Sequence, residues 1–124
     1  MKYHLIERAN PLNREAKKWY ASPVNDGKIS KTELAKEITG MSSLSRGDVS
    51  NVIESLLEAM PKYLLMGKSV SLGEFGTLRL SFTSEGVDTQ EAFNTGKITG
   101  VKVIFTPGVE LKRAIEAVSF ERDE

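Results

Sequence analysis

Several kinds of chemistry are excluded by what the sequence lacks. Its 124 residues include no cysteine, so neither a disulfide nor a reactive thiol is available, a composition compatible with the cytosol. The single histidine, His4, lies beside apolar residues near the N-terminus, and any Ser-His-Asp triad would have to use it. No Cys/His spacing is typical of a metal site, and the acidic residues do not follow the order of a calcium loop. We therefore expect no enzyme, no metal and no cofactor.

Long apolar runs and a net charge are also missing. No run approaches the ~20 apolar residues that span a membrane, and the N-terminus lacks the long apolar segment of a secretory signal. We therefore expect neither a membrane span nor a secretory signal. The 17 basic residues balance 17 acidic residues. Binding to nucleic acid would then need an uneven charge distribution. Residues 1–28 carry six basic and three acidic groups, whereas residues 107–124 carry three and five.

Residues 1–28 read as an extension that we expect to pack on the rest of the molecule. The segment "KYHLIE" predicts a strand, and "ANPLN" predicts a turn because Pro11 lacks a backbone donor. The segment "REAKKWYASPV" fits either a short helix or a second strand. A turn at "NDGK" ends the extension.

Two amphipathic helices follow the extension. Ser30 stands three residues before Glu33, the spacing of a capping box, and Gly40 predicts the end of the first helix. Apolar residues then recur at spacings of three and four over 46–66, which predicts a long helix capped by Ser45. Pro61 lies inside it and predicts a kink or an interruption.

A glycine-rich stretch, "GKSVSLGEFGTLRLSF", comes next. A phosphate-binding loop would lead into a helix N-terminus, but here an alternating strand follows. Gly73 and Gly76 instead predict a sharp corner between two strands, with Phe75 in the core. A polar segment, a strand at "VKVIF" and a short helix at "TPGVELKRAIEAV" complete the chain, so the fold class is α+β.

These motifs resemble the bacterial histone-like HU/IHF family of DNA-binding proteins. The similarity is carried by "SKTELAKEI", "LSRGDVSNVIESLLEAM", "LMGKSVSLGEFGTLRL" and "VIFTPGVELKRAI", within residues 29–82 and 101–118. The N-terminal extension is similar to that of extended HU-like proteins of Bacteroidetes. The resemblance implies an intertwined homodimer with a helix-helix body, a three-stranded antiparallel sheet bearing a β-arm, and a C-terminal helix. The expected organisation is an extension (1–28), a DNA-binding domain (29–118, arm about 83–100) and an acidic tail (119–124).

The function implied by the resemblance is architectural. Such a protein binds double-stranded DNA without sequence preference, condenses it in the cytoplasmic nucleoid, and needs no membrane and no small-molecule substrate. Family matches and surface position suggest DNA contacts at Lys31, Arg46, Arg79, Lys97, Lys102, Lys112 and Arg113. Lys17 and Lys18, beside two aromatic residues, and Phe93 are possible additional contacts.

The arm departs from the family pattern. Family arms are rich in lysine and arginine and carry a proline at the tip, whereas residues 82–100 contain one lysine, three acidic residues and no proline. Phe93 could insert between base pairs as a wedge, or it could pack against its own domain. The departure leaves a second hypothesis open: an HU-type dimeric scaffold with weak or lost DNA binding, which serves protein–protein interaction.

Overall fold

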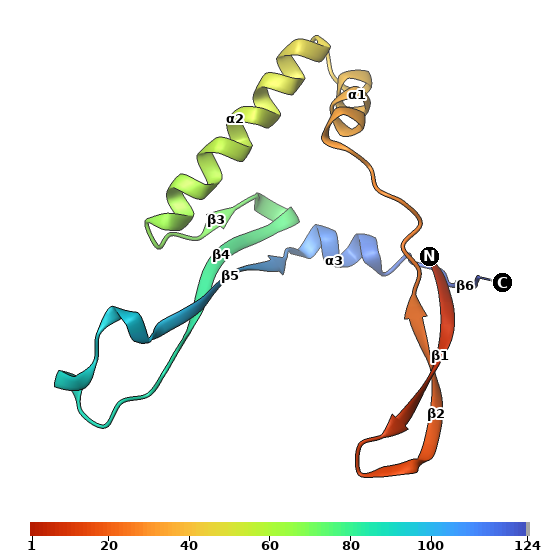
Figure 1. Ribbon diagram of the computed structural model, residues 1–124. Coiled ribbons are helices and arrows are strands. Elements are labelled where there is room, and N and C mark those ends of the chain that lie inside the picture. Colours follow the sequence, from red (N-terminus) through yellow and green to blue (C-terminus); the bar gives the residue numbers. More distant parts are fainter. Residues whose placement is uncertain (124) are drawn as a thin grey trace.

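A computed structural model describes residues 1–123, which form two three-stranded sheets joined by helices (Figure 1). The strand orders are β2-β1-β6 and β3-β4-β5. In chain order the elements are β1 (Lys2–Asn10), β2 (Asn13–Pro23), α1 (Lys31–Met41), α2 (Arg46–Leu65), β3 (Val70–Ser71), β4 (Gly76–Ser84), β5 (Ile98–Pro107), α3 (Val109–Ile115) and β6 (Glu121–Arg122). The α+β class predicted from the sequence is confirmed.

The N-terminal extension is an antiparallel hairpin. Strands β1 and β2 pair from Tyr3↔Pro23 to Ala9↔Lys17, so the second segment is a strand and not a helix. Two asparagines shape the turn, since the side-chain oxygen of Asn10 accepts from the Leu12 N–H at 2.9 Å and that of Asn13 accepts from the Glu15 N–H at 3.2 Å. Local side-chain bonds of this kind favour a turn over a continued ladder.

Residues of the predicted acidic tail complete the N-terminal sheet. Strand β6 pairs in parallel with β1 through Lys2↔Glu121 and Tyr3↔Arg122. The backbone N–H of Glu121 donates to the Met1 carbonyl at 3.0 Å, and the N–H of Asp123 donates to the Tyr3 carbonyl at 2.8 Å. The two ends of the described chain therefore lie side by side (Figure 1).

Both predicted helix caps are present. The hydroxyl oxygen of Ser30 accepts from the Glu33 N–H at 3.1 Å, and that of Ser45 accepts from the Asp48 N–H at 3.1 Å. Helix α1 ends at Met41, just beyond the predicted stop at Gly40.

The predicted interruption at Pro61 is absent, because α2 continues through this residue to Leu65. A proline removes one backbone donor, and the helix continues on both sides of it.

The glycine corner is confirmed as a structural feature. A short 3₁₀ turn, Gly73–Phe75, separates β3 from β4, and both glycines have positive φ, 65° at Gly73 and 153° at Gly76. A Cβ at Gly76 would lie 2.6 Å from the carbonyl oxygen of Thr106, so no side chain fits there. The Gly108 N–H donates to the Phe75 carbonyl at 2.8 Å and fastens the start of α3 to the corner.

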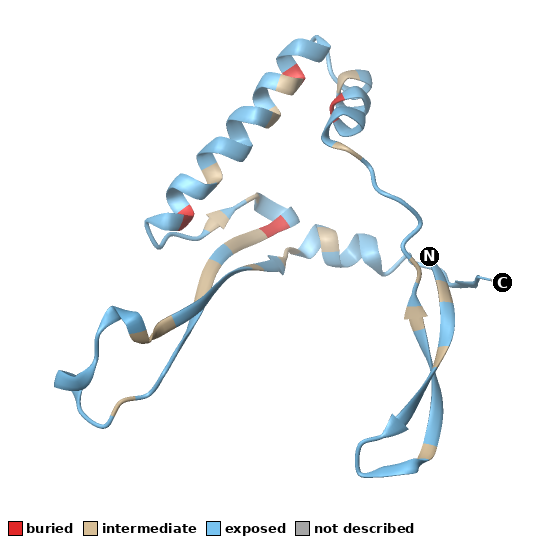
Figure 2. Cartoon of the chain, viewed as in Figure 1, coloured by how far each residue is buried: buried red, intermediate tan, exposed pale blue. Residues whose placement is uncertain are grey.

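The chain on its own encloses almost no core. Within the described residues, Ala35, Val49 and Leu64 are the buried hydrophobic residues (Figure 2). The accessible surface is 10472 Å², whereas a folded monomer of 13.7 kDa exposes about 6,600 Å². The prediction that Phe75 lies in the core is wrong for the single chain, where its tilted ring lies 5.5 Å from the ring of Phe105, centre to centre, but the residue stays 51% exposed. The apolar faces of both helices and the sheet thus remain uncovered.

Candidate nucleic-acid interface

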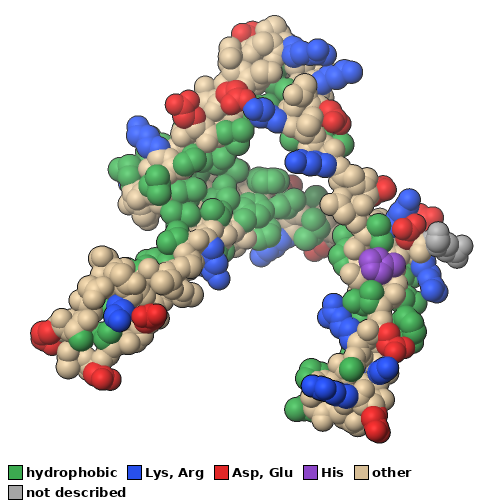
Figure 3. Space-filling view, in the orientation of Figure 1, with side chains coloured by type: hydrophobic (Ala, Val, Ile, Leu, Met, Phe, Trp, Pro, Cys, Tyr) green, Lys and Arg blue, Asp and Glu red, His purple; other side chains and the backbone are tan. Residues whose placement is uncertain are grey.

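The sheet formed by β3, β4 and β5 has one polar and one apolar face. Residues directly opposite in an antiparallel pair share a face. The pairs Leu78↔Phe105 and Leu80↔Val103 therefore form the apolar face. Figure 3 shows hydrophobic side chains between α2 and this sheet, and Lys and Arg side chains on the sheet's other side.

The polar face, which we call the saddle face, is built from three pairs between β4 and β5. They are Thr77↔Thr106, Arg79↔Ile104 and Ser81↔Lys102. Arg79 and Lys102 belong to neighbouring pairs on this face, so they lie diagonally across the two strands. Both residues are exposed. Neither forms an ion pair with a described carboxylate. The saddle face can therefore present two free positive charges to an anion.

The other predicted body contacts divide into paired and unpaired cations. Lys31 forms an ion pair with Glu54 across α1 and α2, and Arg113 bonds Glu110 at 3.4 Å within α3. Arg46, the first residue of α2, and Lys112 of α3 make no ion pair within residues 1–123. The structure thus brings Arg79 and Lys102 together, and it leaves Lys31 and Arg113 next to carboxylates that compete with a phosphate.

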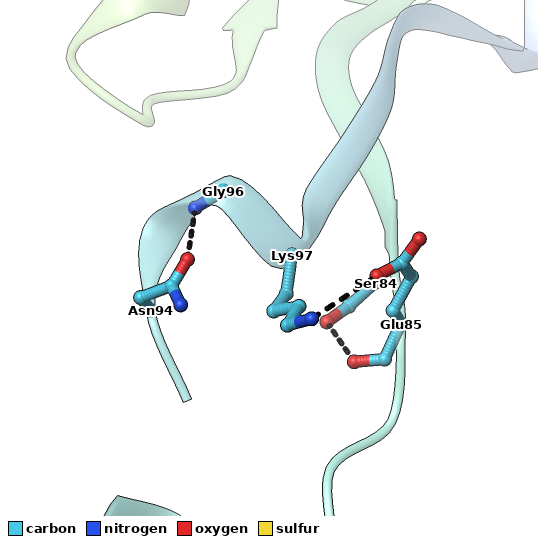
Figure 4. Close-up of polar contacts among 5 residues, drawn as sticks. All are labelled: Ser84, Glu85, Asn94, Gly96 and Lys97. Carbon is cyan, nitrogen blue, oxygen red and sulfur yellow. Dashed lines mark hydrogen bonds and ion pairs between the residues drawn. The ribbon is translucent and has the colours of Figure 1, made fainter. Parts of the chain in front are cut away.

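The segment between β4 and β5, the predicted arm, is held by polar contacts of its own (Figure 4). The ammonium of Lys97 lies 3.6 Å from the carboxylate of Glu85, and the Glu85 N–H donates to the Lys97 carbonyl at 2.9 Å. Farther along, the side-chain oxygen of Asn94 accepts from the Gly96 N–H at 2.9 Å. The lysine of this arm is therefore engaged with a neighbouring acidic residue.

Phe93 lies on the outer part of the same arm. It is half-exposed and lines a shallow hollow together with Val87 and Gln90. Two short 3₁₀ turns, Gln90–Ala92 and Thr95–Lys97, flank it and replace a regular hairpin tip. The arm thus ends in a small folded loop, with acidic side chains at its tip in Figure 3.

The N-terminal hairpin presents two chemically different faces. Its basic face carries the opposed pairs His4↔Ser22, Ile6↔Tyr20 and Arg8↔Lys18. Its apolar face carries Tyr3↔Pro23, Leu5↔Ala21, Glu7↔Trp19 and Ala9↔Lys17. Strand alternation separates Lys17 from Lys18, which the sequence had grouped into one cluster.

The two lysines also differ in their partners. Lys17 lies 3.8 Å from the carboxylate of Glu7 on the apolar face. Lys18 faces Arg8, and the Arg8 guanidinium carbon lies 5.9 Å from the centre of the Tyr20 ring. Sequence reasoning missed Arg8. If "ANPLN" is taken as a hairpin turn, the two flanking strands pair, and this pairing predicts that Arg8 lies opposite Lys18.

Residues 1–123 lack the side-chain clusters of a metal site and the long apolar helix of a membrane span. They contain no group of three or more His, Cys, Asp or Glu side chains that could hold a metal ion. No helix among them is long and apolar enough to cross a lipid bilayer.

The paired helices, glycine corner, saddle sheet and short closing helix together define an HU-type domain. Residues 1–122 match the family model described as "HU-HIG: HU domain fused to wHTH, Ig, or Glycine-rich motif", and the chain belongs to this family. The resemblance to HU inferred from the motifs is confirmed. The matched region also includes the N-terminal hairpin and β6.

A solved structure shares the fold. A protein from Bacteroides vulgatus ATCC 8482, provisionally described as a bacterial DNA-binding protein, matches 98% of this chain with a TM-score of 0.63 and 20% sequence identity. This chain spans 47% of that longer protein. A search of curated proteins gives no significant match.

Proposed function

We propose that this chain is an HU-like, nucleoid-associated DNA-binding module that acts as a homodimer on double-stranded DNA without sequence preference. The observation that carries the proposal is the saddle face, where Arg79 and Lys102 stand together without carboxylate partners in the described chain. Membership of an HU family and the DNA-binding description of a structural neighbour support the same function.

Contacts to phosphate oxygens carry no sequence information. The saddle face offers threonine and serine hydroxyls and two long basic side chains, all suited to phosphate contacts. Arg46 and Lys112 would extend this set, since neither is paired with a carboxylate within residues 1–123. We expect Lys31, Lys97 and Arg113 to contribute less, because a nearby carboxylate already neutralises each charge.

Dimerisation is supported by the uncovered apolar surface. Leu56 and Leu57 on α2 and Phe105 on β5 each expose more than a third of their area. Burying such faces is the dominant favourable term in protein association. A partner copy offers the same apolar faces, so a two-fold pairing could cover both at once.

The binding test uses fluorescence anisotropy with a short linear duplex at ~50 mM salt. We expect Arg79→Gln/Lys102→Gln to weaken binding roughly tenfold and to lower the salt-dependence slope by about two per protomer. The control variant, Lys36→Gln/Lys62→Gln, removes the same charge from exposed positions of α1 and α2. Absence of wild-type binding to linear, nicked and four-way DNA would refute the proposal.

The dimer is tested by light scattering on the same preparation. We expect a mass of about 27 kDa, twice the 13.7 kDa of the chain. A mass near 13.7 kDa would contradict it. Leu56→Asp should shift the mass downward, whereas Ser55→Asp, at the adjacent exposed position of α2, should not.

A second function, an HU-type dimeric scaffold for protein partners, is favoured by one specific observation. The segment 82–100 carries one basic and three acidic residues, and its lysine is paired with Glu85. Such an arm is poorly suited to wrap a polyanion. A stable dimer that binds none of the three DNA forms would support this second function.

A further inference from the structure

The basic face of the N-terminal hairpin contains a feature that structural stability does not explain. Arg8 and Lys18 are directly opposite each other on adjacent strands. Like charges in this position destabilise a sheet. The β1–β2 pairs of this face include no acidic side chain, and the register-paired carboxylate on it, Glu121, lies opposite Lys2 at the other end of β1. Neither Arg8 nor Lys18 forms an ion pair within residues 1–123.

The opposite face of the same hairpin provides an internal comparison. There Lys17 lies 3.8 Å from Glu7, so that charge is balanced locally. The same two strands therefore balance a cation on one face and place two unbalanced cations together on the other. Such a pair is expected where an anion from outside the chain completes the arrangement.

The surroundings of Tyr20 indicate which anion would suit this face. The Arg8 guanidinium carbon lies 5.9 Å from the centre of its ring, a cation–π contact that holds the guanidinium beside the ring. Arg8, Lys18 and Tyr20 also line a surface hollow near the hairpin turn. Two cations that line one hollow favour a phosphate group as the bound anion.

The hairpin is joined to the other end of the described chain by a few backbone hydrogen bonds. The N-terminal amine donates to the Ser119 carbonyl at 2.8 Å, and β6 adds a parallel strand beside β1. Beyond this attachment the hairpin projects freely (Figure 1), with Lys and Arg side chains along it in Figure 3.

We propose that the basic face of the β1–β2 hairpin, through Arg8 and Lys18, binds the phosphate backbone of double-stranded DNA. The hairpin then takes the DNA-contacting role for which the acidic β4–β5 arm is poorly suited. This inference rests on the proposed DNA-binding function and names the surface that adds to it. Its contacts are independent of sequence, because phosphates are the same at every base pair.

The experiment compares the full chain with hairpin variants by anisotropy on a linear duplex over a range of salt concentrations. We expect Arg8→Gln/Lys18→Gln to bind roughly tenfold more weakly at ~50 mM salt, with a salt slope lower by about two per protomer. Lys17→Gln, on the opposite face of the same strand, should change affinity less than twofold because Glu7 already balances that charge.

The result is read together with the saddle variant Arg79→Gln/Lys102→Gln and with circular dichroism, which verifies that each variant is folded. Wild-type affinity and slope in the folded hairpin variant, with a loss in the saddle variant, would overturn the hairpin proposal and leave the proposed function intact. An equal loss from Lys17→Gln would also overturn it, since the effect would then follow total charge and not the basic face. No wild-type binding to any DNA would overturn both proposals.

Discussion

The two ribbons that project from this chain carry opposite net charge. The β4–β5 arm and the β1–β2 hairpin are both antiparallel and both extend away from the helices (Figure 1). Residues 82–100 carry one basic and three acidic side chains, whereas residues 2–23 carry five basic and two acidic ones. The two ribbons therefore differ in the property that governs attraction to a polyanion, which is the charge on their faces.

The two ribbons are also anchored differently. The β4–β5 arm starts at a corner where Gly76 packs directly against Phe105 and Thr106. The hairpin is fastened to the rest of the described chain through the two-residue strand β6, the N-terminal amine and the linker to α1. A substitution at the corner should therefore lower the free energy of unfolding of the whole chain. A substitution in β6 should destabilise the hairpin only locally.

The largest effect is expected from Gly76→Ala. The new methyl group would overlap Phe105 and the Thr106 carbonyl in backbone with φ of 153°, so we expect a loss of about 3 kcal/mol or more in the free energy of unfolding. The control is Gly73→Ala, where φ is 65° but nothing lies within 4 Å of the added carbon. It should cost about 1 kcal/mol. Equal losses in urea denaturation would show that the close packing at Gly76 does not matter.

The second prediction concerns a variant in which the β4–β5 arm becomes basic. Asp88→Lys/Glu91→Lys changes the arm from one basic and three acidic residues to three and one, and leaves the Lys97–Glu85 pair intact. We expect roughly tenfold tighter DNA binding and a steeper salt slope. Glu37→Lys/Glu58→Lys makes the same change in charge on α1 and α2 and should have a smaller effect. Anisotropy titrations that fail to separate the two variants would show that position on the arm is irrelevant.

A third, smaller effect tests the anchor of the hairpin. Glu121→Pro removes the N–H that donates to the Met1 carbonyl, and we expect the amide protons of β1 next to β6 to lose about 1 kcal/mol of protection in hydrogen exchange. Arg122→Pro is the matched control, because the donors to β1 come from residues 121 and 123. Unchanged exchange in Glu121→Pro would indicate that β6 does not hold the hairpin.

The smallest effect is expected from Lys97→Gln in the β4–β5 arm. Its ion pair with Glu85 is largely exposed, so its loss should change the free energy of unfolding by less than about 0.5 kcal/mol. DNA affinity should change by less than twofold, because the charge is already balanced. A loss as large as that of the Arg8→Gln/Lys18→Gln variant would show that the β4–β5 arm also contributes.

Local features of the fold could be predicted from the sequence because they depend on neighbouring residues. The serine caps of α1 and α2 follow from spacings of three residues, and the corner follows from Gly73 and Gly76. Strand β6 could not be predicted, since its partner β1 lies at the other end of the chain. The exposure of Phe75 was also missed, because burial depends on what covers a side chain and not on its type.

The candidate site shows the same division. The sequence identified Arg79, Lys102 and Lys18 as basic surface residues, but it did not identify which cations share a face or have a carboxylate nearby. Lys17 and Lys18 are neighbours in the chain, yet strand alternation points them to opposite faces. Arg8 joined the candidates only through its register with Lys18.

By itself the sequence determined the α+β class, the capped helices, the glycine corner, the resemblance to HU and the acidic character of the β4–β5 arm. These properties depend on composition and on spacings within a few residues. The tertiary structure alone decided the pairing of the chain's two ends, the unbalanced cations on the hairpin and saddle faces, and the ion pairs at Lys31, Lys97 and Arg113. The physical reason is that charge acts through distance in space, and strand register and long-range pairing set those distances.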